Sequence, residues 1–260
     1  MTLLILGGTL DARRAVDALY APLQQMGVDI IYSIAGLVRV PEMPCQVVVG
    51  GFRQFGGLHN YLRDKGIRLL LDITHPYAAT MSATAAAASC EQGIPCWRFQ
   101  RPAWQSQSND QWCEFNNWHE LLPALGDKRS VFLTAGQLPA EALQSFEQRS
   151  ACSKQQLWLR TAVAPKHQLA ANMHWHKAIG PFALAAEIEF MQRAKIDALV
   201  TKNSGGDSTV AKLTAARELG VTVFMLRRPE PGAADKVFGD TETCQLRVQQ
   251  FFSNQLNLGQ

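Results

Sequence analysis

Residues 2–9 read Thr-Leu-Leu-Ile-Leu-Gly-Gly-Thr, and this stretch decides the fold. The aliphatic run at 3–6 fits a strand that is buried on both faces. Two glycines and a threonine follow, and the residues from about Leu10 to Met26 fit a helix that stops at Gly27. A buried strand, a glycine turn and a helix make the start of a βαβ unit. The sequence therefore predicts a parallel α/β sheet.

The same alternation continues through the rest of the chain. We expect further strands at 28–32, 46–49, 67–72, 130–133, 156–159, 174–179, 198–201 and 221–226, with helices around 58–65, 76–89, 140–148, 182–193 and 208–219. A length of 260 residues favours two domains of ordinary size. We expect one domain at residues 1–125 and a second at 126–260. The predicted fold class is α/β, with two Rossmann-like domains that contain parallel sheets.

The composition excludes several classes of protein. A hydrophobic share of 47% excludes a disordered chain, and no apolar run is long enough to cross a membrane. Six cysteines without a C-x-x-C pattern, and a start that lacks the basic segment of a signal peptide, fit a cytoplasmic protein with reduced thiols. The net charge of +3 divides into −1 through residue 125 and +4 after it. No lysine run indicates nucleic-acid binding, whereas a basic second half could attract an anionic small molecule.

The turn at Gly7-Gly8-Thr9 is a candidate cofactor site. Glycines between a strand and a helix let the backbone approach a pyrophosphate, although a tight turn with no ligand remains the alternative because the full G-x-G-x-x-G is missing. An NAD site carries an acidic residue at the end of the second strand. This chain has Ser33 there, then Ala35 and Gly36, with Arg39 close by. A hydroxyl and a cation suit a 2′-phosphate, which favours NADPH over NADH, unless these residues form only a loop.

Two further turns carry candidate ligand residues. Residues 72–78 read Asp-Ile-Thr-His-Pro-Tyr-Ala, and we expect Pro76 to begin a helix that Thr74 or His75 caps. His75 could contact a ligand there, or serve only as a cap or packing residue. Residues 201–208 read Thr-Lys-Asn-Ser-Gly-Gly-Asp-Ser, and this combination before a helix is typical of an anion-binding nest. A plain loop before a capped helix is the alternative.

Three other patterns are weaker. Tyr61 and Lys65 have the Tyr-x-x-x-Lys spacing of short-chain dehydrogenases but lie too early in the chain, so we interpret them as a solvated helix face. His174 and His176 share one strand face without a third ligand in a recognisable pattern, so we expect no metal site. Arg227 or Arg228 could reach a carboxylate or form an ordinary surface pair.

Taken together, these turns resemble the precorrin-6A reductase family of cobalamin biosynthesis, which includes cobalt-precorrin-6A reductases. The resemblance runs in order along nearly the whole chain, through residues 6–13, 33–36, 50–52, 56–58, 72–78, 98–104, 180–182, Glu187, 201–206, Lys212, 215–216 and 228–229. The chain departs from the family at Leu37, where arginine is frequent, and at Asp11, where glutamate is usual.

The resemblance implies an oxidoreductase that uses NADPH to reduce one double bond in the macrocycle of precorrin-6A, or of its cobalt form, to the 6B form. Residues 1–125 would form the NADPH-binding domain and 126–260 the substrate-binding domain, with the active-site cleft between them. The substrate would be a tetrapyrrole polycarboxylate, with no metal cofactor, nucleic acid or membrane as partner. The oligomeric state and the presence of cobalt in the substrate stay open. Two alternatives also stay open: another NAD(P)-linked α/β oxidoreductase acting on an anionic small molecule, or a non-catalytic nucleotide-binding module.

The site residues expected from these turns fall into three groups. The cofactor-binding residues are Gly7, Gly8, Thr9, Ser33, Ala35, Gly36, Arg39, His75, Pro76, Tyr77 and Ala78. The substrate-binding residues are Lys202, Ser204, Gly205 and Gly206, with Arg13 as a possible helper. The catalytic candidates are Lys202 and His75 as proton donors, with solvent as the alternative source of the proton.

Overall fold

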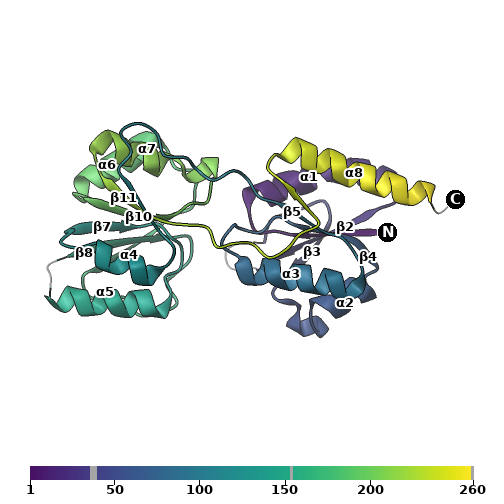
Figure 1. Cartoon of the computed structure of the whole chain (residues 1–260), viewed down its shortest axis with the longest axis horizontal. Coiled ribbons are helices and arrows are strands. Elements are labelled where there is room, and N and C mark those ends of the chain that lie inside the picture. Colours follow the sequence, from purple (N-terminus) through teal and green to yellow (C-terminus); the bar gives the residue numbers. More distant parts are fainter. Residues whose placement is uncertain (36–39, 153–154, 259–260) are drawn as a thin grey trace. The chain divides into compact units, whose positions relative to one another are not determined.

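The chain folds into two compact units, which we call the first and the second unit (Figure 1). The computed structural model describes residues 1–35, 40–152 and 155–258. The first unit comprises Met1–Pro102 and Pro229–Gln260, and the second comprises Ala103–Arg228. This division differs from the expected boundary at residue 125. The reason is strand pairing: β6 (Trp112–Phe115) joins β11 (Thr222–Leu226), and β12 (Lys236–Phe238) returns to β5 (Cys96–Phe99).

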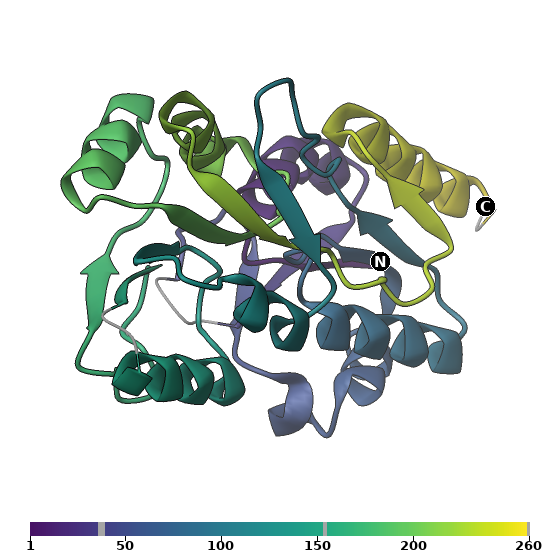
Figure 2. The same cartoon turned by 60° about the vertical axis from the view of Figure 1, so that its left-hand side comes forward.

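The first unit is built on a six-stranded parallel sheet. Its strand order is β12-β5-β4-β1-β2-β3, with β1 at Thr2–Leu6, β2 at Asp29–Ile34, β3 at Gln46–Val49 and β4 at Ile67–Asp72. Figure 2 shows the late strand β12 beside β5. The strand β1 pairs with both β2 and β4, so the strand order reverses there. Ligands of open α/β sheets bind at such a reversal, outside the carboxyl ends of the strands.

Helices cover both faces of this sheet (Figure 1). The helices α1 (Leu10–Gln25) and α8 (Thr241–Asn257) lie on one face and contribute residues to one core cluster. The 3-10 helix η1 (Phe52–Phe55), α2 (Leu58–Asp64) and α3 (Ala79–Gln92) belong to the other face. Buried residues recur along α1 at helical spacing, from Ala12 through Val16 and Leu19 to Leu23. This stripe explains why the segment forms a helix against the sheet despite Pro22.

The second unit resembles the first in strand order, except that its edge strand β6 comes first in its sequence, whereas the edge strand β12 comes last in the first unit. Its parallel sheet runs β6-β11-β10-β7-β8-β9, with β7 at Ser130–Leu133, β8 at Gln156–Thr161, β9 at Met173–Lys177 and β10 at Ala198–Lys202. Its helices are α4 (Trp118–Ala124), α5 (Ala140–Cys152), α6 (Leu184–Arg193) and α7 (Ala211–Leu219), with the 3-10 helix η2 at Asp207–Thr209. Here the strand order reverses between β7 and β10. The predicted α/β class with two parallel, Rossmann-like sheets is confirmed.

The net charges of the two units differ from those of the two domains expected from the sequence. The first unit holds eleven basic and eleven acidic residues, whereas the second holds fourteen basic and eleven acidic ones. The whole net charge of +3 therefore belongs to the second unit, because the segment 229–260, which returns to the first unit, is acidic.

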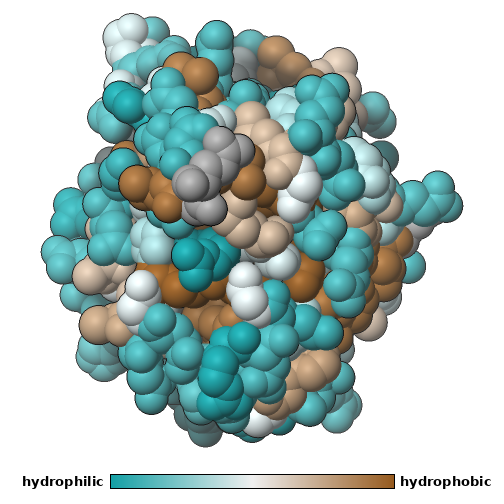
Figure 3. Space-filling model, turned by 90° about the vertical axis from the view of Figure 1, so that its right-hand side faces the viewer, coloured by the Kyte–Doolittle hydropathy of each residue, from teal (hydrophilic) through white to brown (hydrophobic). Residues whose placement is uncertain are grey.

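The face of the molecule in Figure 3 is mainly hydrophilic, and its apolar residues stand in groups between polar ones. Among the helices of the described ranges, none combines the length and the apolar character that a membrane span requires.

Candidate functional site

The first part of the candidate site is the Gly7-Gly8-Thr9 turn, where β1 ends and α1 begins. Thr9 caps α1, because its Oγ1 accepts a hydrogen bond from the backbone N–H of Ala12 at 3.1 Å. The same hydroxyl donates to the carbonyl oxygen of Ile73 at 3.0 Å, just beyond the end of β4. One side chain thus ties together the two turns that flank the strand-order reversal. The structure therefore brings the predicted segments 7–9 and 73–78 side by side.

Gly7 is required by Tyr32, a buried residue of β2, and Gly8 is favoured by its positive φ. A Cβ atom on residue 7 would lie 2.0 Å from Cε2 of the Tyr32 ring, so only glycine fits there. Gly8 has a φ of +103° and its N–H donates to the Tyr32 hydroxyl at 3.0 Å, while the N–H of Gly7 donates to the Ser33 carbonyl at 2.8 Å. These two N–H groups are engaged within the protein. An anion at this turn would have to bind the N–H groups of the first turn of α1, at Leu10 and Asp11.

Asp11 does not oppose an anion at this helix end, because its carboxylate forms an ion pair with Arg101. Arg101 follows β5, so it approaches the turn from the carboxyl edge of the same sheet. The sequence reasoning did not assign a role to Arg101. Its neutralising contact with Asp11 leaves the positive end of the α1 dipole effective.

The remaining residues predicted to bind the adenosine end are only partly described. Ser33 lies inside β2 instead of after it, and it is 5% exposed. Ala35 follows the strand and is exposed. Gly36 and Arg39 lie outside the described residues. The role of all four in cofactor binding stays a prediction.

The second turn, residues 72–78, differs from the expected helix start. The helix α3 begins at Ala79, three residues after Pro76, and neither Thr74 nor His75 caps it. Thr74 instead donates through its backbone N–H and its hydroxyl to Asp72, at 3.0 and 2.7 Å. His75 is exposed, and its Nδ1 accepts from the N–H of Tyr77 at 3.3 Å. Residues 75–78 therefore form a separate turn after β4, in which His75 is exposed and the other three residues are partly buried, because Asp72 holds Thr74 away from the helix.

A buried ion pair lies under this turn, and sequence reasoning missed it. Asp72 ends β4 and Arg98 lies in β5, and their side chains are 1% and 5% exposed. One carboxylate oxygen of Asp72 accepts from Ser82 at 2.6 Å and from Nε of Arg98 at 3.1 Å, while Nη1 of Arg98 donates to the Gly232 carbonyl at 2.6 Å. The pair therefore links β4, β5, α3 and the returning C-terminal segment below the exposed His75 turn.

The third turn, residues 202–206, follows β10 in the second unit. Lys202 is half-buried and burial lowers the pKa of its amine. Asn203 and Ser204 are buried, and Gly205 has a φ of +67°. The backbone then passes through η2 before α7 begins at Ala211. The lysine and the glycine-rich backbone thus stand at the carboxyl edge of the sheet, beside the second strand-order reversal, as anion binding requires.

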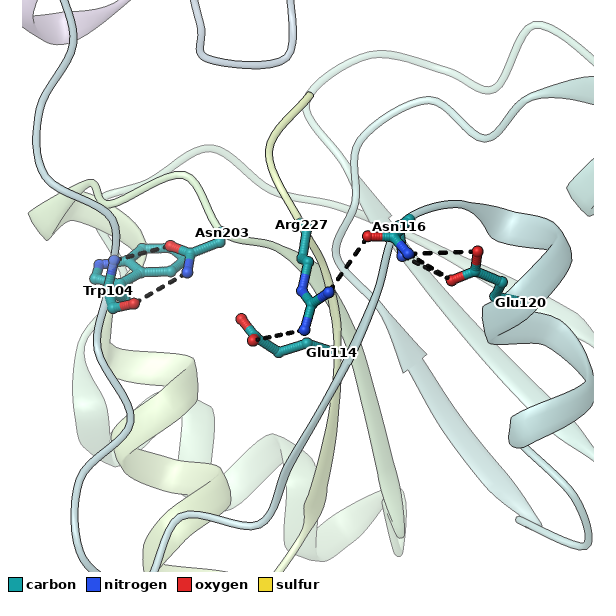
Figure 4. A network of polar contacts seen from close by, with 6 residues as sticks. All are labelled: Trp104, Glu114, Asn116, Glu120, Asn203 and Arg227. Atoms are coloured by element: carbon teal, nitrogen blue, oxygen red, sulfur yellow. Dashed lines mark hydrogen bonds and ion pairs between the residues drawn. The ribbon is translucent and has the colours of Figure 1, made fainter. Parts of the chain in front are cut away.

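Asn203 fixes this turn to the rest of the second unit. Its Oδ1 accepts from the backbone N–H of Trp104 at 2.8 Å and its Nδ2 donates to the Trp104 carbonyl at 3.0 Å (Figure 4). Nε of Arg228 donates to the Asn203 carbonyl at 2.7 Å. Trp104 and Arg228 lie near the two ends of the second unit's chain, so Asn203 holds both ends at the turn.

The two arginines at 227–228 have different roles. Arg227 is half exposed and forms an ion pair with Glu114 at 3.5 Å and a hydrogen bond with Asn116, which joins β11 to β6 (Figure 4). Arg228 holds the third turn, as described above. Arg227 therefore forms a surface ion pair, whereas Arg228 binds the backbone of the third turn.

The structure also shows the surroundings of the residues in the weaker sequence patterns. Tyr61 is 2% exposed and packs against Phe52 and Phe55, so its interpretation as part of a solvated face was wrong. His174 stacks on Trp158 and contacts Gln156 at 2.9 Å. No group of three metal-ligating side chains occurs within the described ranges. Arg13 is exposed on α1 of the first unit, and its help in substrate binding stays a prediction.

The fold and its turns define a protein of the Rossmann-like α/β class, and the comparisons identify the family within it. Residues 2–248 match the family described as precorrin-6x reductase CbiJ/CobK. The precorrin-6A reductase of Rhodococcus erythropolis is 39% identical, over 90% of this chain and 92% of that protein. A solved structure, CobK precorrin-6A reductase, matches with a TM-score of 0.83 and 32% identity over 96% of both chains. The cobalt-precorrin-6A reductase of Priestia megaterium is 25% identical, over 88% of this chain and 91% of that protein.

The chain belongs to the precorrin-6x reductase family. It is therefore an enzyme of the oxidoreductase class, and the resemblance found in the sequence is confirmed.

The buried pair of the first unit yields a stability prediction. Replacing Asp72 with alanine leaves the Arg98 guanidinium buried without its carboxylate, which costs about 3–5 kcal/mol of unfolding free energy. Urea unfolding followed by circular dichroism measures this loss. The control is Asp64→Ala, which breaks the exposed pair with Arg63 and changes the unfolding free energy by less than about 1 kcal/mol. Equal effects of the two substitutions would contradict a structural role for the buried pair.

Proposed function

We propose that this chain catalyses the NADPH-dependent reduction of one double bond in the macrocycle of precorrin-6A, giving the 6B form in cobalamin biosynthesis. The observation that carries the proposal is the family match along residues 2–248, together with a turn suited to a ligand at the carboxyl edge of each sheet. The Thr9–Ile73 contact and the Asn203 contacts order these turns in the free protein.

The first unit fits a dinucleotide. The helix α1 begins at the strand-order reversal, Gly8 has the backbone conformation of a tight glycine turn, and Arg101 neutralises Asp11 at the helix end. The pyrophosphate would contact the N-terminal turn of α1, and the adenosine end would lie near Ser33, Ala35, Gly36 and Arg39. The turn 75–78 would border the nicotinamide, since it follows the neighbouring strand β4. When bound, NADPH supplies the hydride that the reduction requires.

The second unit fits the polycarboxylate. It carries the whole net charge of +3, and its third turn offers Lys202, Ser204 and the backbone of Gly205 and Gly206. We propose that these groups bind carboxylates of the macrocycle and hold it in one orientation. Lys202 and His75 are the proposed proton donors. Burial already lowers the pKa of Lys202, which makes its ammonium a better acid than a solvated lysine.

The relatives favour a cobalt-free substrate. Those named precorrin-6A reductase are 34–39% identical to this chain, whereas those named cobalt-precorrin-6A reductase are 25–28% identical. The proposal also places the enzyme in the cytoplasm, where its unpaired Cys45, Cys90 and Cys96 would remain reduced.

An anaerobic assay tests the proposed reaction. With NADPH and precorrin-6A, we expect loss of nicotinamide absorbance and formation of the 6B product, faster than with NADH and faster than with the cobalt form. Oxidation of NADPH with another acid but not with either macrocycle would support a different oxidoreductase. Binding of NADPH without oxidation would support a non-catalytic module.

A single substitution tests the third turn. Lys202→Ala removes a charged hydrogen-bond donor to a carboxylate, worth about 1.5–3 kcal/mol, so kcat/KM for precorrin-6A falls by roughly one to two orders of magnitude. The dissociation constant for NADPH, measured by nicotinamide fluorescence, stays unchanged. The control is Lys195→Ala, an exposed lysine that precedes β10 at the amino edge of the sheet. Wild-type turnover in Lys202→Ala would remove Lys202 from the site.

A further inference from the structure

A buried charge cluster of the second unit lies outside the turns assigned to the proposed reaction. It consists of Arg160 in β8, Glu187 in α6 and Lys212 in α7, which are 9%, 2% and 4% exposed. Nη1 of Arg160 lies 2.5 Å from Oε1 of Glu187, whereas Oε2 of Glu187 is buried without a hydrogen-bond partner. The Lys212 amine makes no hydrogen bond or ion pair with the described residues, and lies 5.5 Å from the centroid of the Trp104 ring.

Such an arrangement is costly for a merely structural element. Burial disfavours the charged form of the Lys212 amine, and an apolar side chain of similar length would fill the same space without that cost. The cluster also leaves one carboxylate oxygen unsatisfied beside two cationic side chains. These features indicate a role that requires a group able to gain and lose a proton.

Two aromatic residues connect the cluster to the third turn and to the segment that follows it. Trp104 faces Lys212 with its ring and binds the side chain of Asn203 through its backbone, at 2.8 and 3.0 Å. The ring of Phe182 lies 3.8 Å from the guanidinium carbon of Arg160, and the backbone N–H of Phe182 donates to the Ser208 carbonyl at 3.2 Å. The segment 203–208 is thus held at both ends by residues that pack on the cluster.

The charge state of Lys212 responds to its surroundings near neutral pH. Its pKa is lowered to about 7, chiefly by burial and also by the charge of Arg160, while Glu187 acts in the opposite direction. These are the charged groups that act on it, from β8 and α6, while the segment that bears Trp104 contributes an uncharged ring. A negative charge bound close by favours the protonated amine, and this effect is strong where water is excluded.

We propose that the Arg160–Glu187–Lys212 cluster links anion binding at the third turn to the uptake of one proton by Lys212. The proposal rests on the proposed function of residues 202–206 as a carboxylate-binding turn. When a carboxylate of the substrate binds there, the Lys212 amine takes a proton from solvent and becomes an ammonium. Lys212 is a positioning residue: its charge adds to the potential that holds the substrate, and Trp104 and Phe182 keep the turn in place above it.

The proposed proton uptake determines the direction in which pH changes the affinity for the substrate. Because binding takes up a proton, the affinity for precorrin-6A falls as the pH rises above the pKa of Lys212 in the free protein, by up to about tenfold per pH unit. Lys212→Arg removes this dependence, since the guanidinium stays charged. Lys212→Met removes it as well and weakens binding below pH 7, where the wild-type amine is charged.

Calorimetry tests the inference directly. Precorrin-6A is titrated anaerobically into the full chain without NADPH, near pH 8, in buffers of different ionisation enthalpy, which yields the number of protons taken up. We expect uptake approaching about one proton for the wild type and for the exposed-lysine control Lys195→Met, and close to none for Lys212→Arg. Lys212→Arg preserves the charge and Lys212→Met the size of the side chain, so loss of uptake in both assigns the proton to Lys212.

The outcomes separate the inference from the function on which it rests. Binding by Lys212→Arg and Lys212→Met with wild-type proton uptake would overturn the linkage and leave the carboxylate-binding turn intact. Absence of binding in the wild type itself would overturn the turn's proposed function, and the linkage with it.

Discussion

Both parts of the site depend on one constraint, which is the reversal of strand order inside each parallel sheet. In the first unit β1 pairs with β2 and β4, and in the second unit β7 pairs with β8 and β10. Because all these strands are parallel, their following turns emerge at one edge of each sheet. Helices on opposite faces then diverge from that edge, and the backbone N–H groups and side chains between them become available to a ligand.

Each edge is stabilised by a different kind of contact. In the first unit the Thr9 hydroxyl joins two turns, and the buried pair of Asp72 and Arg98 joins β4 to β5 beneath them. In the second unit the side chain of Asn203 pairs with the backbone of Trp104, as a neighbouring strand would. The conformations of these turns are therefore fixed before any ligand binds. This lowers the entropy cost of orienting two reactants.

The features that could be predicted from the sequence are local ones. The apolar runs at 3–6, 69–71 and 131–133 lie within β1, β4 and β7, because a strand buried on both faces favours consecutive apolar residues. The turn at residues 7–9 and the third turn at 202–206 could also be predicted, from their composition and their position after a strand. The start of α3 was misplaced because Asp72, by binding Thr74, competes with helix formation at Pro76.

What could not be predicted requires partners distant in the sequence. The domain boundary depends on β12 finding β5, and the buried charges depend on Asp72 meeting Arg98 and on Arg160 meeting Glu187. No spacing rule connects such residues, since they lie on different strands or helices. A partial signal existed in Arg98 and Arg160, each of which stands in a strand with apolar neighbours and needs a carboxylate.

We propose that the chain transfers the hydride of a bound NADPH directly to the macrocycle of precorrin-6A. The most direct test uses NADPH carrying deuterium at C4 of the nicotinamide, in each of its two stereoisomers, with mass spectrometry of the macrocyclic product. The account predicts one deuterium in the product from one stereoisomer and none from the other. Product formed without deuterium from either stereoisomer would contradict it.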